Sequence, residues 1–235
     1  DRGGIDRSQP LKFQFNGKHY TGYQGDTLAS ALLANGVELV ARSFKYHRPR
    51  GILSAGSEEP NALVPVGRGA NGLPNCPATM VELYDGLEAH SQNCWPSVNF
   101  DISAVNNMLS RFFPAGFYYK TFMWPKALWM KYEEVIRHSA GLGVCPPEPD
   151  PDHYDQQQTY SDVLVVGGGP SGLSAAMAAA RSGAQVLLVN EQAQWGGMLN
   201  SATKRINEQG AMQWALETLD ELRGMGNVRL LDRTT

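Results

Sequence analysis

A glycine-rich loop is the part of this sequence whose residue types and spacing point most directly to chemistry. The loop runs from Gly167 to Gly172, reads GGGPSG and fits the pattern G-x-G-x-x-G. In that pattern Gly167 permits a tight turn, Gly169 lets the backbone approach a pyrophosphate, and Gly172 lets a helix pack close to the preceding strand. Free N–H groups at the start of that helix face the phosphates. We therefore predict that Gly167, Gly169, Pro170, Ser171 and Gly172 bind a dinucleotide.

An acidic residue stands at the distance from the loop that a ribose contact requires. Glu191 lies 19 residues after Gly172, where its carboxylate accepts hydrogen bonds from a ribose 2′-hydroxyl and repels a 2′-phosphate, so NADP is disfavoured. Gly196 and Gly197 follow and allow a loop to pass near the adenosine. A glycine turn selected only for strand–helix packing leaves Glu191 unexplained. NAD and FAD share this fingerprint, so the residues alone do not separate them.

The elements that must position these residues follow the order strand, loop, helix, strand, helix, strand. The expected elements are a strand at 163–166, a helix after the loop that ends at Gly183, a strand at 184–189, a helix at 207–223 and a strand at 228–231. This is the first half of a Rossmann-type dinucleotide-binding domain, because the strands across the switch point are missing. We expect the chain to be the N-terminal part of a longer polypeptide.

The first third of the sequence predicts a small α+β domain. Residues 11–15 alternate between apolar and polar, and Asn16-Gly17 is typical of a two-residue hairpin turn before a partner strand at 18–23. A helix follows, with Asp26 as its N-cap and Gly36 at its C-terminal end. Residues 43–75 show no periodicity and predict a long loop, followed by a strand at 79–83.

Half of the aromatic residues fall between Cys94 and His138, where a helix is expected over 127–138. Either these rings fill the seam between two domains, or they dock another subunit. Residues 145–158 have the composition of a linker. We expect three regions: residues 1–92, a connector over 93–159, and the dinucleotide-binding half-domain over 160–235.

Composition excludes several classes of function. The chain is 42% hydrophobic and 18% charged, with a formal net charge of −3, which argues against nucleic-acid binding. Its three widely spaced cysteines form no disulfide framework and suit a reducing, cytoplasmic compartment. The uncharged run at 163–180 contains a Gly-Pro turn, so no membrane span is expected. The five histidines show no metal-ligand spacing.

Two groups of charged residues are further candidates for a binding or catalytic site. His47, with Lys45, Arg48 and Arg50, forms a basic group that either binds an anionic cofactor tail or lies in a solvated or interface loop. Glu58-Glu59 lacks a second acid at helical spacing and is not expected to act as a general acid–base pair. We expect no catalytic residue and no metal ligand in this chain.

Several segments resemble the alpha subunits of bacterial heterotetrameric sarcosine oxidases. The matching segments are RGGIDRSQ at 2–9, GDTLASALLANGV at 25–37, SFKYHRPRGI at 43–52, GFYYKTFMWP at 116–125 and VLVVGGGPSGL at 163–173. The resemblance implies a ferredoxin-like β-grasp domain at the N-terminus. Relatives hold a [2Fe–2S] cluster at positions that fall here on Ser54, Glu59, Ala62 and Cys76. Because only Cys76 supplies a thiolate, we expect no iron–sulfur cluster.

The resemblance also implies a function. Such enzymes demethylate sarcosine to glycine, reduce oxygen to hydrogen peroxide and transfer the one-carbon unit to tetrahydrofolate. They have beta, gamma and delta subunits, with FAD and FMN mainly on beta, and NAD on the glycine loop of alpha. Two alternatives stay open. The segment is a non-catalytic scaffold, or it belongs to a related amine or opine dehydrogenase with FAD in this domain, which would require a complete cysteine set.

Overall fold

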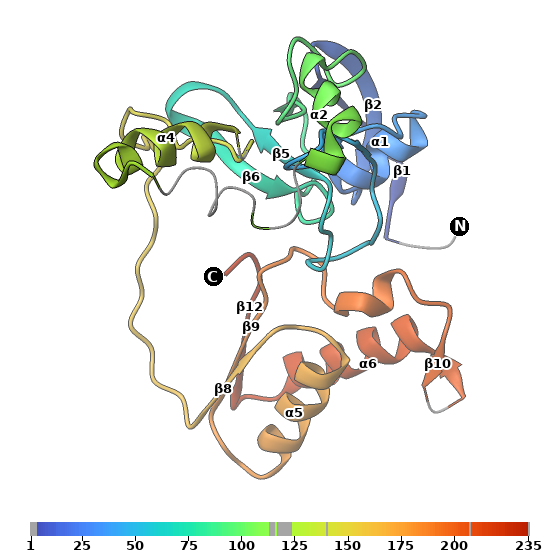
Figure 1. Cartoon of the computed structure of the whole chain (residues 1–235). Helices are drawn as coiled ribbons and strands as arrows, with labels where there is room; N and C mark the ends of the chain where they lie inside the picture. The colour runs from blue at the N-terminus through green and yellow to red at the C-terminus, as the bar shows by residue number, and fades with distance from the viewer. Residues whose placement is uncertain (1–3, 113–115, 117–123, 140, 207, 235) are drawn as a thin grey trace. The chain divides into compact units, whose positions relative to one another are not determined.

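The computed structural model describes residues 4–112, 116, 124–139, 141–206 and 208–234. Within it the chain divides into two compact units, one comprising Ile5–Asp152 and the other built on His153–Thr235. Both contain helices and sheets, which confirms the mixed α and β content predicted from the sequence (Figure 1). No helix in the described ranges has the length and apolar character needed to cross a membrane.

The sheet of the first unit is built around an N-terminal hairpin. β1 (Asp6–Phe15) and β2 (Lys18–Gln24) pair antiparallel through the predicted turn, where Asn16 and Gly17 both have positive φ. The strand order is β2-β1-β7-β5-β6, and the remaining strands are β5 (Leu63–Val66), β6 (Leu73–Pro77) and β7 (Glu88–Ala89). A separate two-stranded ladder joins β3 (Ala41–Arg42) to β4 (Pro49–Arg50).

The helix α1 (Leu28–Ala34) supplies apolar side chains to the core of this unit. Its N-cap is Thr27, not Asp26, because Thr27 and Ser30 form a reciprocal capping box. Asp26 instead accepts hydrogen bonds from Tyr23 N and Ser30 Oγ. The helix and the sheet enclose Phe13, Phe15, Leu28, Leu32 and Leu87, all buried.

Two expectations for the middle of this unit are wrong. Residues 43–75 are not one loop, because β4, β5 and most of β6 lie within them. The predicted strand at 79–83 forms no ladder and makes only an isolated bridge between Glu82 and Thr27. The strand that completes the sheet is β7, which pairs parallel with β1 and antiparallel with β5.

The aromatic-rich segment belongs to the same compact unit as the sheet. It contains α2 (Val105–Met108) and α4 (Trp129–Ser139), and α4 together with the preceding turn at Lys126–Leu128 corresponds to the predicted helix. Phe113, Phe117, Tyr118, Tyr119 and Phe122 lie outside the described residues. The described rings of Trp95, Phe100, Phe112 and Trp124 are exposed.

The second unit is a three-stranded parallel sheet covered by two helices. β8 (Val163–Val166), β9 (Val186–Val189) and β12 (Val228–Leu231) pair in the order β12-β9-β8. α5 (Pro170–Arg181) and α6 (Ala211–Gly224) lie side by side against the sheet (Figure 1). A short hairpin of β10 (Arg205–Ile206) and β11 (Gln209–Gly210) precedes α6.

Two predictions for this unit need correction. The second helix was expected from residue 207, but α6 begins at Ala211 because β10 and β11 occupy the residues before it. β8 was expected to be buried, yet Leu164 and Val166 are exposed. Alternate residues of a strand face opposite sides of a sheet, and α5 packs against the face that carries Val163 and Val165.

Candidate functional site

The glycine loop lies at the carboxyl edge of the parallel sheet. It joins the end of β8 to the start of α5, and Asn190-Glu191 follow the end of the neighbouring strand β9. Because parallel strands end at the same edge, the loop and Glu191 are neighbours, and the Gly168 N–H donates to Asn190 Oδ1 at 3.0 Å. In α/β sheets this edge is where ligands bind.

Three glycines of the loop are required by the fold itself. Gly167 has φ +102°, in the region that favours glycine. A Cβ on Gly172 would lie 1.9 Å from the Gly167 carbonyl oxygen, so α5 packs on the loop only without a side chain there. A Cβ on Gly168 would lie 2.5 Å from the Trp195 ring and 2.9 Å from the Asn190 side chain.

Gly169 differs from these three. Its φ is −78°, which any residue adopts, and no chain atom lies within 4 Å of the position that a Cβ would take. Neither backbone conformation nor packing inside the described chain therefore explains a glycine at this position. Close approach by a bound molecule does, since a pyrophosphate passes against the backbone at this point of the pattern.

The start of α5 offers donors to such a molecule. Its N-cap is Gly169, which has no side chain to cap the helix, and Pro170 stands at the first helical position. Within the described residues, the N–H groups of Ser171 and Gly172 have no hydrogen-bond partner. Unpaired N–H groups and the positive end of the helix dipole together favour an anion.

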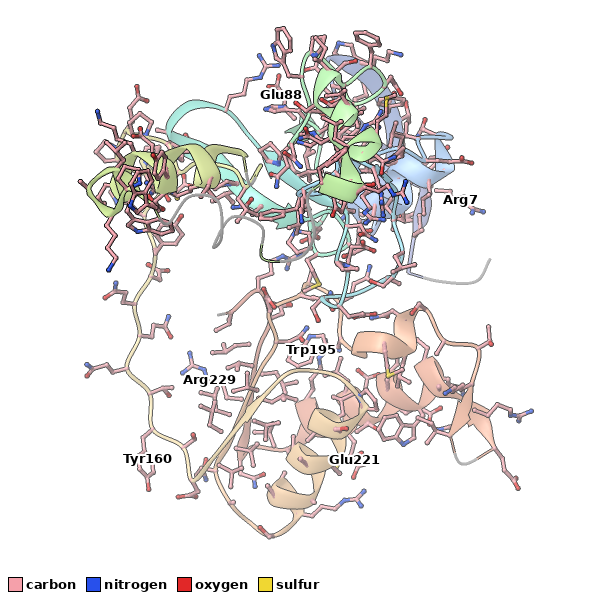
Figure 2. All side chains as sticks on the ribbon, in the orientation of Figure 1. Arg7, Glu88, Tyr160, Trp195, Glu221 and Arg229 are labelled. Carbon is pink, nitrogen blue, oxygen red and sulfur yellow. The ribbon has the colours of Figure 1, made fainter. Side chains whose placement is uncertain are left out.

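Gly196 and Gly197 lie against the glycine loop. The Gly196 N–H donates to the Gly168 carbonyl at 2.8 Å, and a Cβ on Gly197 would lie 3.0 Å from Gly169 Cα. Both have positive φ. Trp195, labelled in Figure 2, is buried behind the loop, so it packs under Gly168.

Glu191 is exposed and has no partner among the described residues, so its carboxylate is free to accept hydrogen bonds from a ligand. Sequence reasoning missed Asn190, the residue before it, which is buried and bonds to the glycine loop. The signal in the sequence was a polar residue directly after an apolar strand. Such a residue is buried only where its amide is hydrogen-bonded.

In the first unit, a buried carboxylate organises the loop that includes residues 53–62. Glu59 is 4% exposed, and its Oε2 accepts N–H groups of Leu53 and Ser54, both at 2.7 Å. Its Oε1 accepts those of Asn61 at 2.8 Å and Ala62 at 3.1 Å. Burial raises the pKa of Glu59, but the four N–H donors outweigh it and hold the pKa below its ordinary value.

Within the basic cluster, His47 itself is not solvated, although Arg48 is exposed. His47 is buried, and its Nδ1 lies 2.7 Å from Asp101 Oδ2. Lys45 and Arg48 instead lie over the ring of Tyr46. His47 therefore links the segment at 43–50 to the aromatic-rich segment, which leaves it unavailable to an anionic cofactor tail.

Two cysteines of the first unit have weakly acidic thiols. Burial raises the pKa of Cys76. Burial also raises the pKa of Cys94, with a further increase from the charge of Asp101 that Arg42 partly offsets. Both groups are thiols at neutral pH, so neither has the reactivity of a thiolate nucleophile.

Comparisons with known proteins agree with this division of the chain. The family described as 2Fe-2S iron-sulfur cluster binding domain matches residues 8–94, and the family described as FAD dependent oxidoreductase matches residues 162–225. The sarcosine oxidase subunit alpha of Rhizobium meliloti (strain 1021) is 60% identical over 235 residues, which is 100% of this chain and 24% of the relative. The chain is related to the alpha subunits of sarcosine oxidases.

More distant similarities extend over nearly the whole chain. The sarcosine oxidase subunit alpha of Corynebacterium sp. (strain U-96) is 36% identical over 98% of this chain and 20% of the relative. The L-proline dehydrogenase of P. horikoshii matches in structure with a TM-score of 0.52 at 18% identity, over 97% of this chain and 34% of that one, which shows a likeness of fold alone. The chain thus spans about a quarter of the length of the curated relatives it matches, or less.

The match over residues 8–94 contradicts the prediction of no iron–sulfur cluster, and that prediction is withdrawn. The prediction rested on counting thiolates at positions 54, 59, 62 and 76, whereas the match to the 2Fe-2S family extends over residues 8–94. The residues present still do not fit a ligand set of four thiolates. Among the four positions 54, 59, 62 and 76, only Cys76 carries a thiol, and Glu59 is held by backbone N–H groups. In the described ranges no three His, Cys, Asp or Glu side chains gather to hold a metal.

Proposed function

We propose that this chain is the dinucleotide-binding part of a sarcosine oxidase alpha subunit, and that its second unit binds NAD. The observation that carries the proposal is Gly169, a glycine that neither φ nor packing in the described chain requires, at the entrance to a helix with unpaired N–H groups. The identity of 60% to the Rhizobium meliloti relative supports the family part of the proposal.

In this proposal, different residues bind different parts of the cofactor. The backbone from Gly167 to Gly172 receives the pyrophosphate, with N–H donors from Ser171 and Gly172. Glu191 accepts hydrogen bonds from the adenosine ribose. Gly196 and Gly197 keep the following loop close to Gly169 without side chains that would obstruct the adenosine. The unit is then the mononucleotide-binding half of a Rossmann-type domain.

The wider activity is proposed from the relatives. The whole protein would oxidise sarcosine to glycine as one subunit of an assembly with beta, gamma and delta subunits, the flavins lying mainly on beta. We assign no acid–base or nucleophilic step to the described residues of this chain. Its role is to bind the dinucleotide and to contribute surface to the assembly.

FAD is the second candidate for the same site. The match of residues 162–225 to FAD dependent oxidoreductases favours it. NAD and FAD share the ADP half, so the same loop and the same acidic residue serve either one. The two candidates differ in the molecule that the purified protein releases.

Substitution of Glu191 tests the ribose contact. Loss of hydrogen bonds to a charged acceptor costs about 1.5–3 kcal/mol, so Glu191→Ala is expected to weaken NAD binding roughly tenfold or more. The same variant should bind NADP relatively better, because the charge that repels a 2′-phosphate is gone. Binding is measured by calorimetry on full-length protein stripped of nucleotide. Glu217→Ala, an exposed site on α6, is the control. Unchanged affinity in Glu191→Ala would remove this residue from its assigned role.

A further inference from the structure

The side chain of Asn190 joins two loops at the carboxyl edge of the parallel sheet. It is 6% exposed, and all three of its side-chain hydrogen bonds go to backbone groups. Its Oδ1 accepts the Gly168 N–H at 3.0 Å, while its Nδ2 donates to the carbonyls of Gln192 at 2.7 Å and Gln194 at 3.0 Å. One buried amide therefore connects the glycine loop to the segment that follows Glu191.

The peptide groups of Gly168 are fixed from both sides by this connection. Asn190 holds the N–H of Gly168, and the Gly196 N–H holds its carbonyl at 2.8 Å. The Trp195 ring and the Asn190 side chain lie where a Cβ on Gly168 would be. Gly168 thus has little freedom to rotate its peptide planes, and the orientation of Gly169, the next residue, is set with it.

Hydrogen bonds of Asn190 also fix the segment that carries Glu191, the residue proposed to bind the ribose. The Asn190 Nδ2 donates a hydrogen bond to the Gln192 carbonyl, and Glu191 lies between these two residues. This bond closes the local turn that exposes the Glu191 carboxylate. The two parts of the proposed nucleotide site, for pyrophosphate and for ribose, are therefore held by one buried side chain whose amide oxygen and nitrogen are both bonded to the backbone.

We propose that Asn190 is a positioning residue for an adenine dinucleotide. The inference rests on the function proposed above, because it takes the glycine loop and Glu191 as the binding groups. Asn190 holds both in their binding arrangement before the ligand arrives, which removes the ordering cost that a free loop would pay on binding. Loss of its amide removes the bond to the Gly168 N–H and the bonds to the Gln192 and Gln194 carbonyls, so both loops lose a restraint.

The test is dinucleotide affinity in an Asn190→Ala variant of the full-length protein. Stripped protein is titrated with NAD and, separately, with FAD, at a temperature where each variant is folded by circular dichroism. We expect the dissociation constant of the dinucleotide that the wild type binds to rise roughly tenfold or more, as loss of a buried hydrogen bond implies. Hydrogen exchange at the Gly168 amide should accelerate in parallel.

Asn200→Ala is the matched control. The Asn200 Nδ2 donates to the carbonyls of Trp195 and Gly197 in the same segment, but it bonds to no atom of residues 167–172. We expect its affinity to stay within about twofold of the wild type, since a bond outside the glycine loop leaves the loop's preorganisation intact. Equal losses in Asn190→Ala and Asn200→Ala would show a general effect on the segment and overturn the assignment to Asn190.

Asn190→Asp separates positioning from simple loss of stability. The carboxylate keeps an acceptor for the Gly168 N–H, but it loses the two donated bonds and adds a negative charge beside the loop that receives the pyrophosphate. We therefore expect restored protection of the Gly168 amide without restored affinity. A Gly168 amide that exchanges as fast in Asn190→Asp as in Asn190→Ala would contradict the role of the Gly168 bond. If the wild type binds a dinucleotide and the Asn190→Ala variant binds it with the same affinity, this inference alone is overturned. If the wild type binds neither NAD nor FAD, the proposed function is overturned.

Discussion

A Gly169→Ala variant is expected to fold normally and to lose most of its bound dinucleotide. The methyl group meets no chain atom within 4 Å and the φ of −78° suits alanine, so the fold changes little. The same methyl group would occupy the space where a pyrophosphate approaches the backbone. We expect an affinity loss of roughly tenfold or more. Calorimetric titration gives the affinity, and thermal unfolding without nucleotide gives the stability.

Two other glycine variants make this result interpretable. Gly172→Ala places a Cβ 1.9 Å from the Gly167 carbonyl oxygen, and overpacking against fixed backbone costs about 3 kcal/mol or more in the free energy of unfolding. Gly226→Ala, in open space before β12 and with no positive φ, should leave both stability and affinity unchanged. If Gly169→Ala lost stability like Gly172→Ala while keeping its nucleotide, this glycine would serve packing alone.

Replacing Glu59 should open the loop at residues 53–62. In Glu59→Ala four backbone N–H groups lose their acceptor. The Ala62 bond is buried and the other three are partly buried, so the cost of about 1–3 kcal/mol for a buried unpaired donor applies in full only at Ala62. After some rehydration we expect the unit Ile5–Asp152 to lose roughly 3 kcal/mol or more of its free energy of unfolding. Urea unfolding measures the loss, and hydrogen exchange at Leu53, Ser54, Asn61 and Ala62 locates it.

The contribution of Glu59 should depend on pH in one direction. Its folded pKa is lowered, so its stabilisation is complete above about pH 4.3, the unperturbed pKa of a glutamate, and is lost as pH falls through the folded value. The stability difference between wild type and Glu59→Gln should therefore shrink at acid pH. Glu58→Gln, at the exposed neighbouring residue, is the control. A difference that stays constant down to pH 3 would contradict the role of the ionised carboxylate.

Elements with local signals could be predicted from the sequence. The hairpin of β1 and β2 is determined by alternation and by the Asn16-Gly17 turn, both within a few residues. The succession of β8, α5 and β9 follows from short apolar runs interrupted by glycine. Their positions were found because the signals lie within each segment itself, even though β8, β9 and β12 obtain their ladder hydrogen bonds from one another.

Elements that depend on distant partners were not found. β5 contains Pro65 and β7 has two residues, so each exists only because other strands of the sheet supply its hydrogen bonds. The segment at 79–83 has the composition of a strand, yet in the part of the chain that the structure describes it joins no ladder and makes one isolated bridge. Asp26 and Thr27 are both good capping residues, and only the geometry of Ser30 decides between them.

In the candidate site, too, some residues could be predicted from the sequence and others could not. The glycines and Glu191 carry a recognised spacing, so the sequence points to them directly. Asn190 and Glu59 fix other loops through backbone peptide groups and have no such spacing, since their partners are groups that the backbone carries throughout. Their importance appears only in the burial and the hydrogen bonds of the folded chain.

NAD binding by this chain is tested most directly by identifying the nucleotides that the purified protein carries. The full-length protein is purified in the assembly that it forms, denatured, and its released nucleotides are identified and counted by mass spectrometry. We expect one NAD for each copy of this chain, in addition to any flavin, and its loss in the Gly169→Ala variant. Complete absence of any adenine dinucleotide assignable to this chain, with full occupancy of flavin elsewhere in the assembly, would contradict it.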